Sequence, residues 1–444
     1  MKLLYVAPSA YLLGGVQDWL ADLVEDQRRL GLNVTVAVPD DAIHRLDPYA
    51  SRYPKLRPVA FRNPSGSEAG RIRALEHLLL AHPDHLVIGV NIASLFGAVR
   101  RMRLRNAFHG RLLMTLHAIE PDYFDDLREH SDVIDALVVT NRLSGALAKA
   151  LSQLPSQRIA YAPYGVAVPD HPPVASPAGQ PQQPLRIAWV GRLEQRQKRV
   201  GDIAPILKAL EASGTAFELT IAGEGPENHA VAKDLGHWIK RSQVKLLGAI
   251  SRRRLHDEVY AKHDALLITS SWETGPIVAW EAMAAGVAVV SSRYVGSGLE
   301  GALQQDQTAL LFPVGDCEAA AQQLIRLRER DLRRQLSLRG KDLVSRRYSR
   351  QASLNAWTQA FSAASALDPL PHPLRKHLIP ASGRLDHVFG PFGAERIRRR
   401  LGLAFRHAQA GSEWPHSGHS GGSFDALLDL AASLEQTAPQ PLHG

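Results

Sequence analysis

Two glutamates, Glu273 and Glu281, lie eight residues apart in a segment whose order of residue types suits ligand binding. Apolar residues 265–269 precede the pair, and residues 287–290 follow it after Gly286, which predicts one strand–helix–strand step of a parallel sheet. Glu273 then falls in the loop after the first strand, where open α/β sheets bind ligands, and Glu281 falls inside the helix. Carboxylates accept hydrogen bonds from hydroxyl groups, so the segment predicts a site for a polyhydroxylated ligand. A capped helix start with one solvated glutamate is the alternative interpretation.

Several other residues share a place directly after a predicted strand. They are a glycine pair, a histidine, an arginine followed six residues later by a lysine, and a glycine–proline loop: Gly14 and Gly15, His117, Arg192 and Lys198, Gly225 and Pro226. The backbone at glycine can approach an anion closely, and Arg and Lys side chains bind phosphate oxygens. Each position alone is explained equally well by a turn, a buried histidine or a solvated cation. Their common location at strand ends favours a ligand site.

The elements that must position these residues alternate along two stretches of the chain. Strands are expected at residues 2–7, 33–38, 86–90, 111–116, 136–140 and 159–161, and again at 185–190, 218–222, 244–247, 265–269, 287–291 and 309–312. Helix-like or loop segments separate them. This alternation predicts an α/β protein with two Rossmann-like doubly wound domains that face each other across a cleft.

The length of 444 residues fits two domains, because single cores stop growing beyond about 250–300 residues. We expect a first α/β domain at residues 1–168, a linker rich in proline and glutamine at 169–184, and a second α/β domain at 185–350. A helix at 351–367 is expected to pack back toward the first domain, and residues 368–444 form a basic tail without an assignable role. Two short helices are expected in the tail, at 396–403 and 424–434.

Composition restricts the class of protein. The single cysteine, Cys317, excludes an intrachain disulfide and fits a reducing cytoplasm, and no stretch approaches the ~20 apolar residues of a membrane span. A cytoplasmic protein is therefore expected. The net charge of +8 is gathered in clusters that lack metal-binding Cys/His spacing or interleaved aromatic residues, so nucleic-acid binding is not expected.

One basic cluster alternates with apolar residues. It comprises Arg100, Arg101, Arg103 and Arg105, with Val99, Met102 and Leu104 between them. A basic, partly apolar surface predicts peripheral contact with an anionic membrane, because each arginine near such a surface contributes about 1 kcal/mol. A solvated helix end that touches nothing is the alternative.

Taken in this order, the strand-end residues resemble the retaining glycosyltransferases of family 4, which have the GT-B fold. The resemblance spans roughly residues 1–361 and is most specific from Trp189 to Gly315. It implies that the second domain binds a nucleotide sugar, an NDP-hexose, as co-substrate and that the first domain binds the acceptor. It also implies retention of the anomeric configuration by front-face attack.

The resemblance assigns roles residue by residue. Arg192 and Lys198 would hold the diphosphate, Glu281 the ribose hydroxyls, Glu273 the sugar hydroxyls, and His117 would lie beside the sugar at the reaction centre. The remaining donor-binding positions would be Gly15, the base pocket at Gly225 and Pro226, and Gly275, Ile277 and Val278. Three residues depart from the family pattern: Pro276, which lacks an N–H donor, Arg199 in the place of a common glycine, and Trp280, as packing or as a stacking surface.

Charge considerations agree with these roles. Departure of a nucleoside diphosphate builds negative charge on its β-phosphate, which fixed cations at that point stabilise. The chain has no Asp-x-Asp at a convincing strand end, so Arg192 and Lys198 are expected to replace a metal, and no other cofactor is expected. The predicted reaction is hexose transfer to a glycan or lipid-linked acceptor in polysaccharide biosynthesis. A nucleotide-sugar 2-epimerase of the same fold, or a non-catalytic subunit of a polysaccharide assembly, is the alternative.

Overall fold

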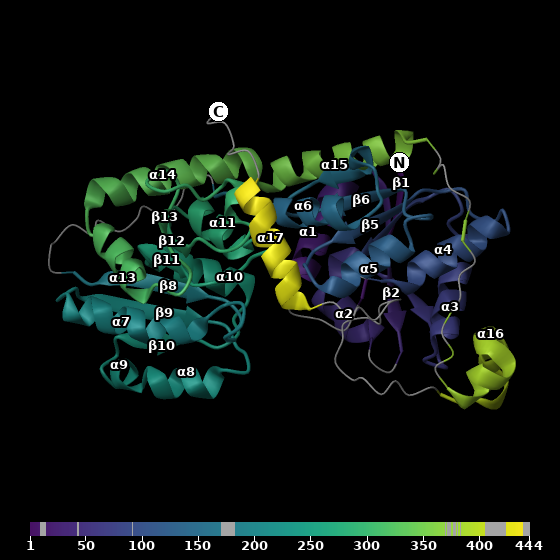
Figure 1. The fold of residues 1–444 in the computed structure, drawn as a ribbon, viewed down its shortest axis with the longest axis horizontal. Helices are drawn as coiled ribbons and strands as arrows, with labels where there is room; N and C mark the ends of the chain where they lie inside the picture. Colours follow the sequence, from purple (N-terminus) through teal and green to yellow (C-terminus); the bar gives the residue numbers. More distant parts are fainter. Residues whose placement is uncertain are drawn as a thin grey trace. The chain divides into compact units, whose positions relative to one another are not determined.

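A computed structural model gives the structure of the chain. It describes residues 1–8, 15–41, 44–90, 92–169, 183–368, 370, 374–375, 379, 381, 383–404 and 423–437. The chain forms two compact units (Figure 1). Unit 1 comprises Met1–Ala162 and Leu354–Leu427, and unit 2 comprises Pro163–Ser353 and Leu428–Gly444. Nearly all of the predicted linker, residues 169–184, lies outside the described residues, as does Gly14.

Unit 1 is built on a seven-stranded parallel sheet in the order β3-β2-β1-β4-β5-β6-β7. Its strands are β1 Lys2–Val6, β2 Asn33–Asp40, β3 Val59–Arg62, β4 Leu86–Val90, β5 Leu112–Leu116, β6 Ala136–Val139 and β7 Ile159–Tyr161. Every residue of β4, β5 and β6 is buried, as expected of a parallel sheet covered by helices on both faces. Six of these strands were predicted, and edge strand β3 was missed.

Helices alternate with these strands. They are α1 Gly15–Arg29, α2 Leu46–Arg52, α3 Glu68–Leu80, α4 Ser94–Leu104, α5 Pro121–Glu129 and α6 Arg142–Leu151, with 3₁₀ turns η1 Pro54–Leu56 and η2 Ser156–Arg158. Helix α1 buries Leu20, Leu23 and Val24 on one face, the spacing of an amphipathic helix. Ser67 and Asn141 cap α3 and α6 by accepting backbone N–H bonds from Gly70 and Ser144.

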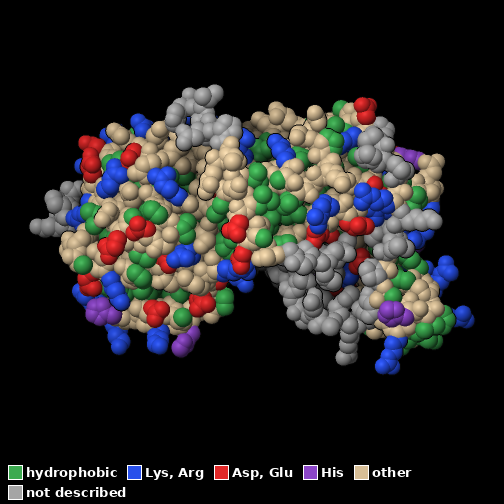
Figure 2. Space-filling model, viewed as in Figure 1, with side chains coloured by type: hydrophobic (Ala, Val, Ile, Leu, Met, Phe, Trp, Pro, Cys, Tyr) green, Lys and Arg blue, Asp and Glu red, His purple; other side chains and the backbone are tan. Residues whose placement is uncertain are grey.

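The C-terminal part of the chain contributes α15 Arg350–Ala366, α16 Arg384–Leu401 and α17 Phe424–Thr437. From Leu354 onward α15 belongs to unit 1, where the Phe361 ring lies 6.3 Å from that of Tyr5. Helix α16 is longer than predicted and is kinked at Gly390, whose φ of 67° and ψ of 159° are non-helical. Hydrophobic and basic side chains gather over α16 at the surface (Figure 2).

The arginines of α4 do not form the open basic surface that the sequence predicted. Arg100 is fully enclosed and donates to both carboxylate oxygens of Asp132, at 3.0 and 2.5 Å. Arg103 donates to Asp135 at 2.5 Å, and its side chain is only 15% exposed. Because these two cations are already paired inside unit 1, they cannot meet a membrane.

The remaining residues of the α4 cluster are also largely engaged. Arg101 and Arg105 lie 2.6 and 3.5 Å from the same carboxylate oxygen of Glu76. Val99 and Met102 are buried. Leu104 and Arg105, at the end of the helix, keep exposed side chains. The open basic surface is thus reduced to this end, and membrane contact there stays a prediction.

Unit 2 is built on a six-stranded parallel sheet in the order β10-β9-β8-β11-β12-β13. Its strands are β8 Leu185–Val190, β9 Phe217–Ala222, β10 Val244–Leu246, β11 Ala265–Ile268, β12 Ala288–Ser292 and β13 Leu310–Phe312. All six were predicted, with ends that differ by one residue or agree. The fold class, two parallel-sheet α/β domains, is thus confirmed.

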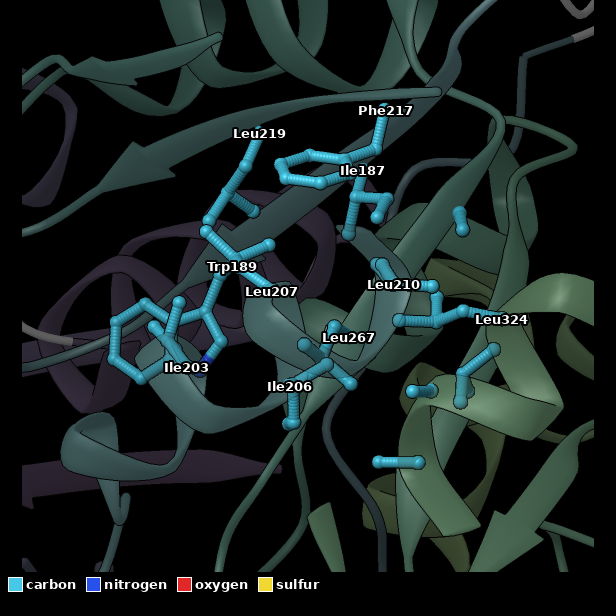
Figure 3. Packing of buried hydrophobic residues seen from close by; sticks show 14 of the residues in the cluster. Ile187, Trp189, Ile203, Ile206, Leu207, Leu210, Phe217, Leu219, Leu267 and Leu324 are labelled. Atoms are coloured by element: carbon cyan, nitrogen blue, oxygen red, sulfur yellow. The ribbon is translucent and has the colours of Figure 1, made fainter. Parts of the chain in front are cut away.

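The helices of unit 2 cover this sheet. They are α7 Ile203–Ala212, α8 Asn228–Asp234, α9 Gly236–Lys240, α10 Arg252–Arg254, α11 Ile277–Ala284, α12 Ser297–Glu300, α13 Cys317–Arg326 and α14 Arg330–Arg347, with short turns η3 Val200–Asp202, η4 Leu255–Val259 and η5 Tyr260–Lys262. Ile206, Leu207 and Leu210 of α7 pack in one buried cluster with Trp189 and Leu219 of the sheet (Figure 3). This core fixes the strands whose carboxyl ends carry the candidate site.

Candidate functional site

Two of the predicted residues meet directly in unit 2. Glu273 lies in the loop after β11, and Lys198 lies in the loop after the neighbouring strand β8. The Lys198 Nζ donates to Glu273 Oε1 at 2.6 Å, and the Ser270 hydroxyl donates to the same oxygen at 2.6 Å. The Glu273 side chain is 6% exposed and that of Lys198 is 20% exposed. Since neither donor uses Oε2, that oxygen keeps its capacity to accept a bond from a ligand.

The loop after β8 is held in shape by a carboxylate that the sequence analysis did not single out. Glu194 accepts backbone N–H bonds from Arg196, Gln197 and Lys198, at 2.9, 2.8 and 2.7 Å. The Thr269 hydroxyl in turn donates to the Lys198 carbonyl at 2.6 Å, which ties this loop to the end of β11. Lys198 is therefore positioned at both its backbone and its side chain.

Arg192 has a different environment from Lys198. It is exposed in the loop directly after β8, and its guanidinium has no partner among the described residues. Arg199 pairs with Asp202 at 2.8 Å and adopts a left-handed φ of 49°. This conformation explains in physical terms why glycine suits the position, since other residues are strained there.

Glu281 lies on α11 and is held by two residues from one irregular helical segment. Arg252 Nε donates to Glu281 Oε1 at 2.7 Å, and the Tyr260 hydroxyl donates to Oε2 at 3.2 Å. Burial, reinforced by the Glu281 charge, raises the pKa of Tyr260 well above its ordinary value, so this hydroxyl stays protonated and donates. Neither partner was predicted; the run of three arginines at 252–254 was the available signal.

The glycine-containing loops pack too tightly for side chains. A Cβ on Gly225 would lie 2.2 Å from the Leu193 carbonyl oxygen, and one on Gly223 would lie 1.8 Å from that of Gly191. Glycine at these two positions therefore lets the loop after β9 lie against the loop after β8. Pro226, the other predicted base-pocket residue, is exposed beside Gly225.

The start of α11 contains the other predicted donor-binding residues. Gly275 has a φ of 94°, and Ile277 and Val278 are the half-buried first residues of the helix. Pro276 stands at the N-cap, where the missing N–H costs no helical hydrogen bond. Trp280 is 1% exposed and stacks on Tyr348 with ring centroids 4.1 Å apart, so it is a packing residue.

Unit 1 holds the two other predicted residues, His117 and Gly15. His117 follows β5, is buried beside the ring of Trp19, and has its Nε2 2.9 Å from the Thr115 hydroxyl oxygen. Burial lowers the pKa of His117 to about 3, so the ring is neutral near pH 7. Gly15 is the exposed first residue of α1.

The described residues contain neither a metal-binding cluster nor a membrane-spanning helix. Within them, no group of three or more His, Cys, Asp or Glu side chains could hold a metal ion. No helix in the same part of the chain is long and apolar enough to cross a membrane.

The second unit matches a known family. Residues 184–330 match the family model described as "Glycosyl transferases group 1". This region contains every candidate residue of unit 2. A curated relative, the amylovoran biosynthesis glycosyltransferase AmsK of Erwinia amylovora, is 31% identical over 150 residues. That alignment covers 33% of this chain and 36% of AmsK, so the chain spans about a third of its relative's length.

Solved structures match over a larger part of the chain. The lipopolysaccharide outer core galactosyltransferase WaaB, in its apo form, has a TM-score of 0.65 at 17% identity and covers 82% of this chain and 99% of its own. HepE from Anabaena, in complex with UDP-glucose, has a TM-score of 0.64 at 16% identity and covers 82% and 100%. The two parallel-sheet units therefore have the fold of GT-B glycosyltransferases, as predicted. The family match and the curated relative each cover about a third of the chain, and the solved structures show a shared fold.

Proposed function

We propose that the protein is a glycosyltransferase that moves a hexose from a nucleotide-sugar donor to a glycan or lipid-linked acceptor. In this proposal unit 2 binds the donor, the anomeric configuration is retained, and no metal is required. The observation that carries the proposal is the pairing of Lys198 with Glu273 at adjacent strand ends, beside the exposed Arg192. HepE was solved with UDP-glucose, which supports a nucleotide sugar as the donor. AmsK acts in amylovoran biosynthesis, which supports a role in polysaccharide synthesis.

The donor's diphosphate is assigned to Lys198 and Arg192. An ammonium group has three N–H donors, and Glu273 uses one of those of Lys198, so two remain for phosphate oxygens. Arg192 adds a guanidinium that no described residue occupies. When the bond between the sugar C1 and the phosphate oxygen breaks, these cations stabilise the charge that develops on the leaving group.

The hydroxyl groups of the donor are assigned to the two glutamates. Glu273 Oε1 is occupied by Lys198 and Ser270, which leaves Oε2 to accept a bond from a sugar hydroxyl. Arg252 and Tyr260 hold the Glu281 carboxylate in one orientation, in which its remaining lone pairs accept bonds from the ribose hydroxyls.

The proposed transfer proceeds on one face of the sugar. The acceptor oxygen forms a bond to C1 on the side from which the phosphate leaves, and the departing phosphate oxygen takes the acceptor's proton. The double hydrogen bonding of Glu273 Oε1 supports this route over a covalent intermediate on Glu273, because a carboxylate engaged in this way is a weaker nucleophile. The neutral His117 is assigned only a hydrogen bond to the sugar.

A donor panel tests the proposal. The full chain is titrated with UDP-, GDP- and ADP-linked glucose and galactose, and release of nucleoside diphosphate is measured with and without EDTA. We expect donors with one of the three nucleotides to bind selectively. Without acceptor, their nucleoside diphosphate should be released slowly, in amounts that EDTA does not change. With acceptor, NMR of the product should show the donor's anomeric configuration. Part of the proposal is contradicted if EDTA stops the release, if the product has the inverted configuration, or if a 2-epimerised nucleotide sugar forms. The whole proposal is overturned if none of the donors binds.

A further inference from the structure

Helix α16 and the two residues that follow it expose several large apolar side chains in a short stretch of unit 1. Val388, Phe389, Leu401 and Leu403 are 72%, 56%, 64% and 46% exposed. They are four of the twelve large hydrophobic residues found exposed in the described chain, although they fall within sixteen residues of sequence. Single exposed apolar residues need no explanation, whereas a group of them marks an interaction surface.

The exposed charge of α16 is entirely positive. Arg384, Arg396, Arg399 and Arg400 are exposed, and the two acidic residues of the helix, Asp386 and Glu395, are buried. Asp386 pairs with the buried Arg398 at 2.7 Å. Glu395 accepts hydrogen bonds from the hydroxyl groups of Ser65 and Ser67, both at 2.6 Å. Both carboxylates are therefore paired inside the unit, and the four exposed arginines face solvent.

The helix is fixed to unit 1 rather than loosely attached. Besides the Glu395 bonds to the loop before α3, the guanidinium of Arg101 lies 3.7 Å from the ring centroid of Phe392. Arg73 of α3 donates to the Phe392 carbonyl at 3.5 Å. Arg101, which the sequence analysis assigned to a membrane surface, thus anchors the element that carries the exposed apolar residues.

We infer that α16 is a docking surface for an anionic phospholipid bilayer. Arginines on a helix that also exposes apolar side chains match a surface of phosphate headgroups over hydrocarbon, because the cations bind the former while the apolar tips enter the latter. Nucleic acid would use the arginines but leave Val388 and Phe389 in water. Figure 2 shows hydrophobic, basic and histidine side chains mixed over α16. The inference is independent of the proposed catalytic reaction.

Vesicle flotation of the full chain tests the inference. The vesicles are phosphatidylcholine alone or phosphatidylcholine with 30% phosphatidylglycerol, each at 50 and 500 mM salt. We expect at least tenfold more protein on the anionic vesicles at low salt, and most of it released at high salt. Arg396→Glu/Arg399→Glu/Arg400→Glu should lower this binding at least tenfold. Val388→Ser/Phe389→Ser should lower it several-fold while the salt dependence persists.

Helix α14 provides the matched control, since it also carries arginines and an exposed leucine, Leu338, but keeps the exposed acid Asp342. Arg334→Glu/Leu338→Ser/Arg339→Glu should float like the parent protein. Circular dichroism and urea denaturation verify that each variant is folded. Absence of parent binding at low salt, equal loss in the α14 variant, or unchanged binding in both α16 variants overturns the inference. Binding to duplex DNA that the α16 triple variant loses, without vesicle binding, assigns the surface to nucleic acid and also overturns it.

Discussion

The ion pairs of the two units are made of the same residue types, but their cations differ in solvent exposure. On α4 of unit 1, Arg100 and Asp132 are 0% and 1% exposed, so water and ligands are excluded from both partners. In the candidate site of unit 2, the carboxylates Glu273 and Glu281 are also nearly buried, but Lys198 and Arg252 are 20% and 35% exposed. A pair whose cation reaches the surface can share that cation with a ligand, whereas an enclosed pair can only hold the fold together.

Breaking the enclosed pair should have the largest effect on stability. Arg100→Ala leaves Asp132 buried without its two guanidinium bonds and should lower the free energy of unfolding by about 3–5 kcal/mol. Urea denaturation followed by circular dichroism measures the change. The control is Arg105→Ala, directly after the same helix. The Arg105 side chain is 54% exposed, and its removal should change stability by less than about 0.5 kcal/mol. Equal effects of the two substitutions would mean that an enclosed ion pair stabilises the fold no more than an exposed one.

The open cations should instead affect turnover. Lys198→Ala and Arg192→Ala should each reduce kcat by a factor of about 10²–10³, roughly 3–4 kcal/mol of transition-state stabilisation, with a smaller loss of stability than Arg100→Ala. Steady-state kinetics with the donor found in the panel measures this. Arg196→Ala, an exposed residue of the same loop, is the control and should be active. Near-normal activity of both variants, together with inhibition of the parent by EDTA, would contradict charge stabilisation by these side chains.

Removing either of the two carboxylates should have the smallest effect of these substitutions. Glu281→Ala should weaken binding of free nucleoside diphosphate by roughly tenfold or more, because a charged hydrogen bond contributes about 1.5–3 kcal/mol. Glu273→Ala should change that affinity less than about threefold and lower kcat instead, since its ligand is the sugar. Calorimetric titration with the nucleoside diphosphate compares the two. The reverse ranking would mean that the two glutamates exchange roles.

The sheets could be predicted from sequence because buried parallel strands are continuous apolar runs. The strand β3, Val59–Arg62, was missed because it is an edge strand with only one buried residue, Phe61, and so lacks such a run. Glu273 and Lys198 could be placed in the loops after strands for the same reason, and Glu281 in the helix that follows. Their partners could not, because Ser270, Arg252 and Tyr260 have side chains common on any surface and become informative only through contacts.

Long-range pairing explains why most arginines of α4 do not lie on an open surface. The alternation of arginine with apolar residues at 99–105 is the same whether the cations face solvent or acids, and Asp132 stands 32 residues beyond Arg100. The apolar and basic surface exists instead on α16, in a region whose helical extent was underestimated. Gly390 and Pro391 interrupt the pattern there, and α16 consists of two helical parts that meet at a kink at Gly390.

Three tryptophans lie next to residues of the candidate site, in sequence or through a hydrogen bond. Trp189 donates from its indole to the Thr269 hydroxyl at 3.1 Å, Trp272 precedes Glu273, and Trp280 precedes Glu281. Two of the seven tryptophans of the chain are therefore sequence neighbours of a site glutamate. A third donates to Thr269, whose hydroxyl holds the Lys198 carbonyl. The emission of these fluorophores depends on the polarity and charge around them, so the protein contains its own optical reporter of events at this site, without any attached dye.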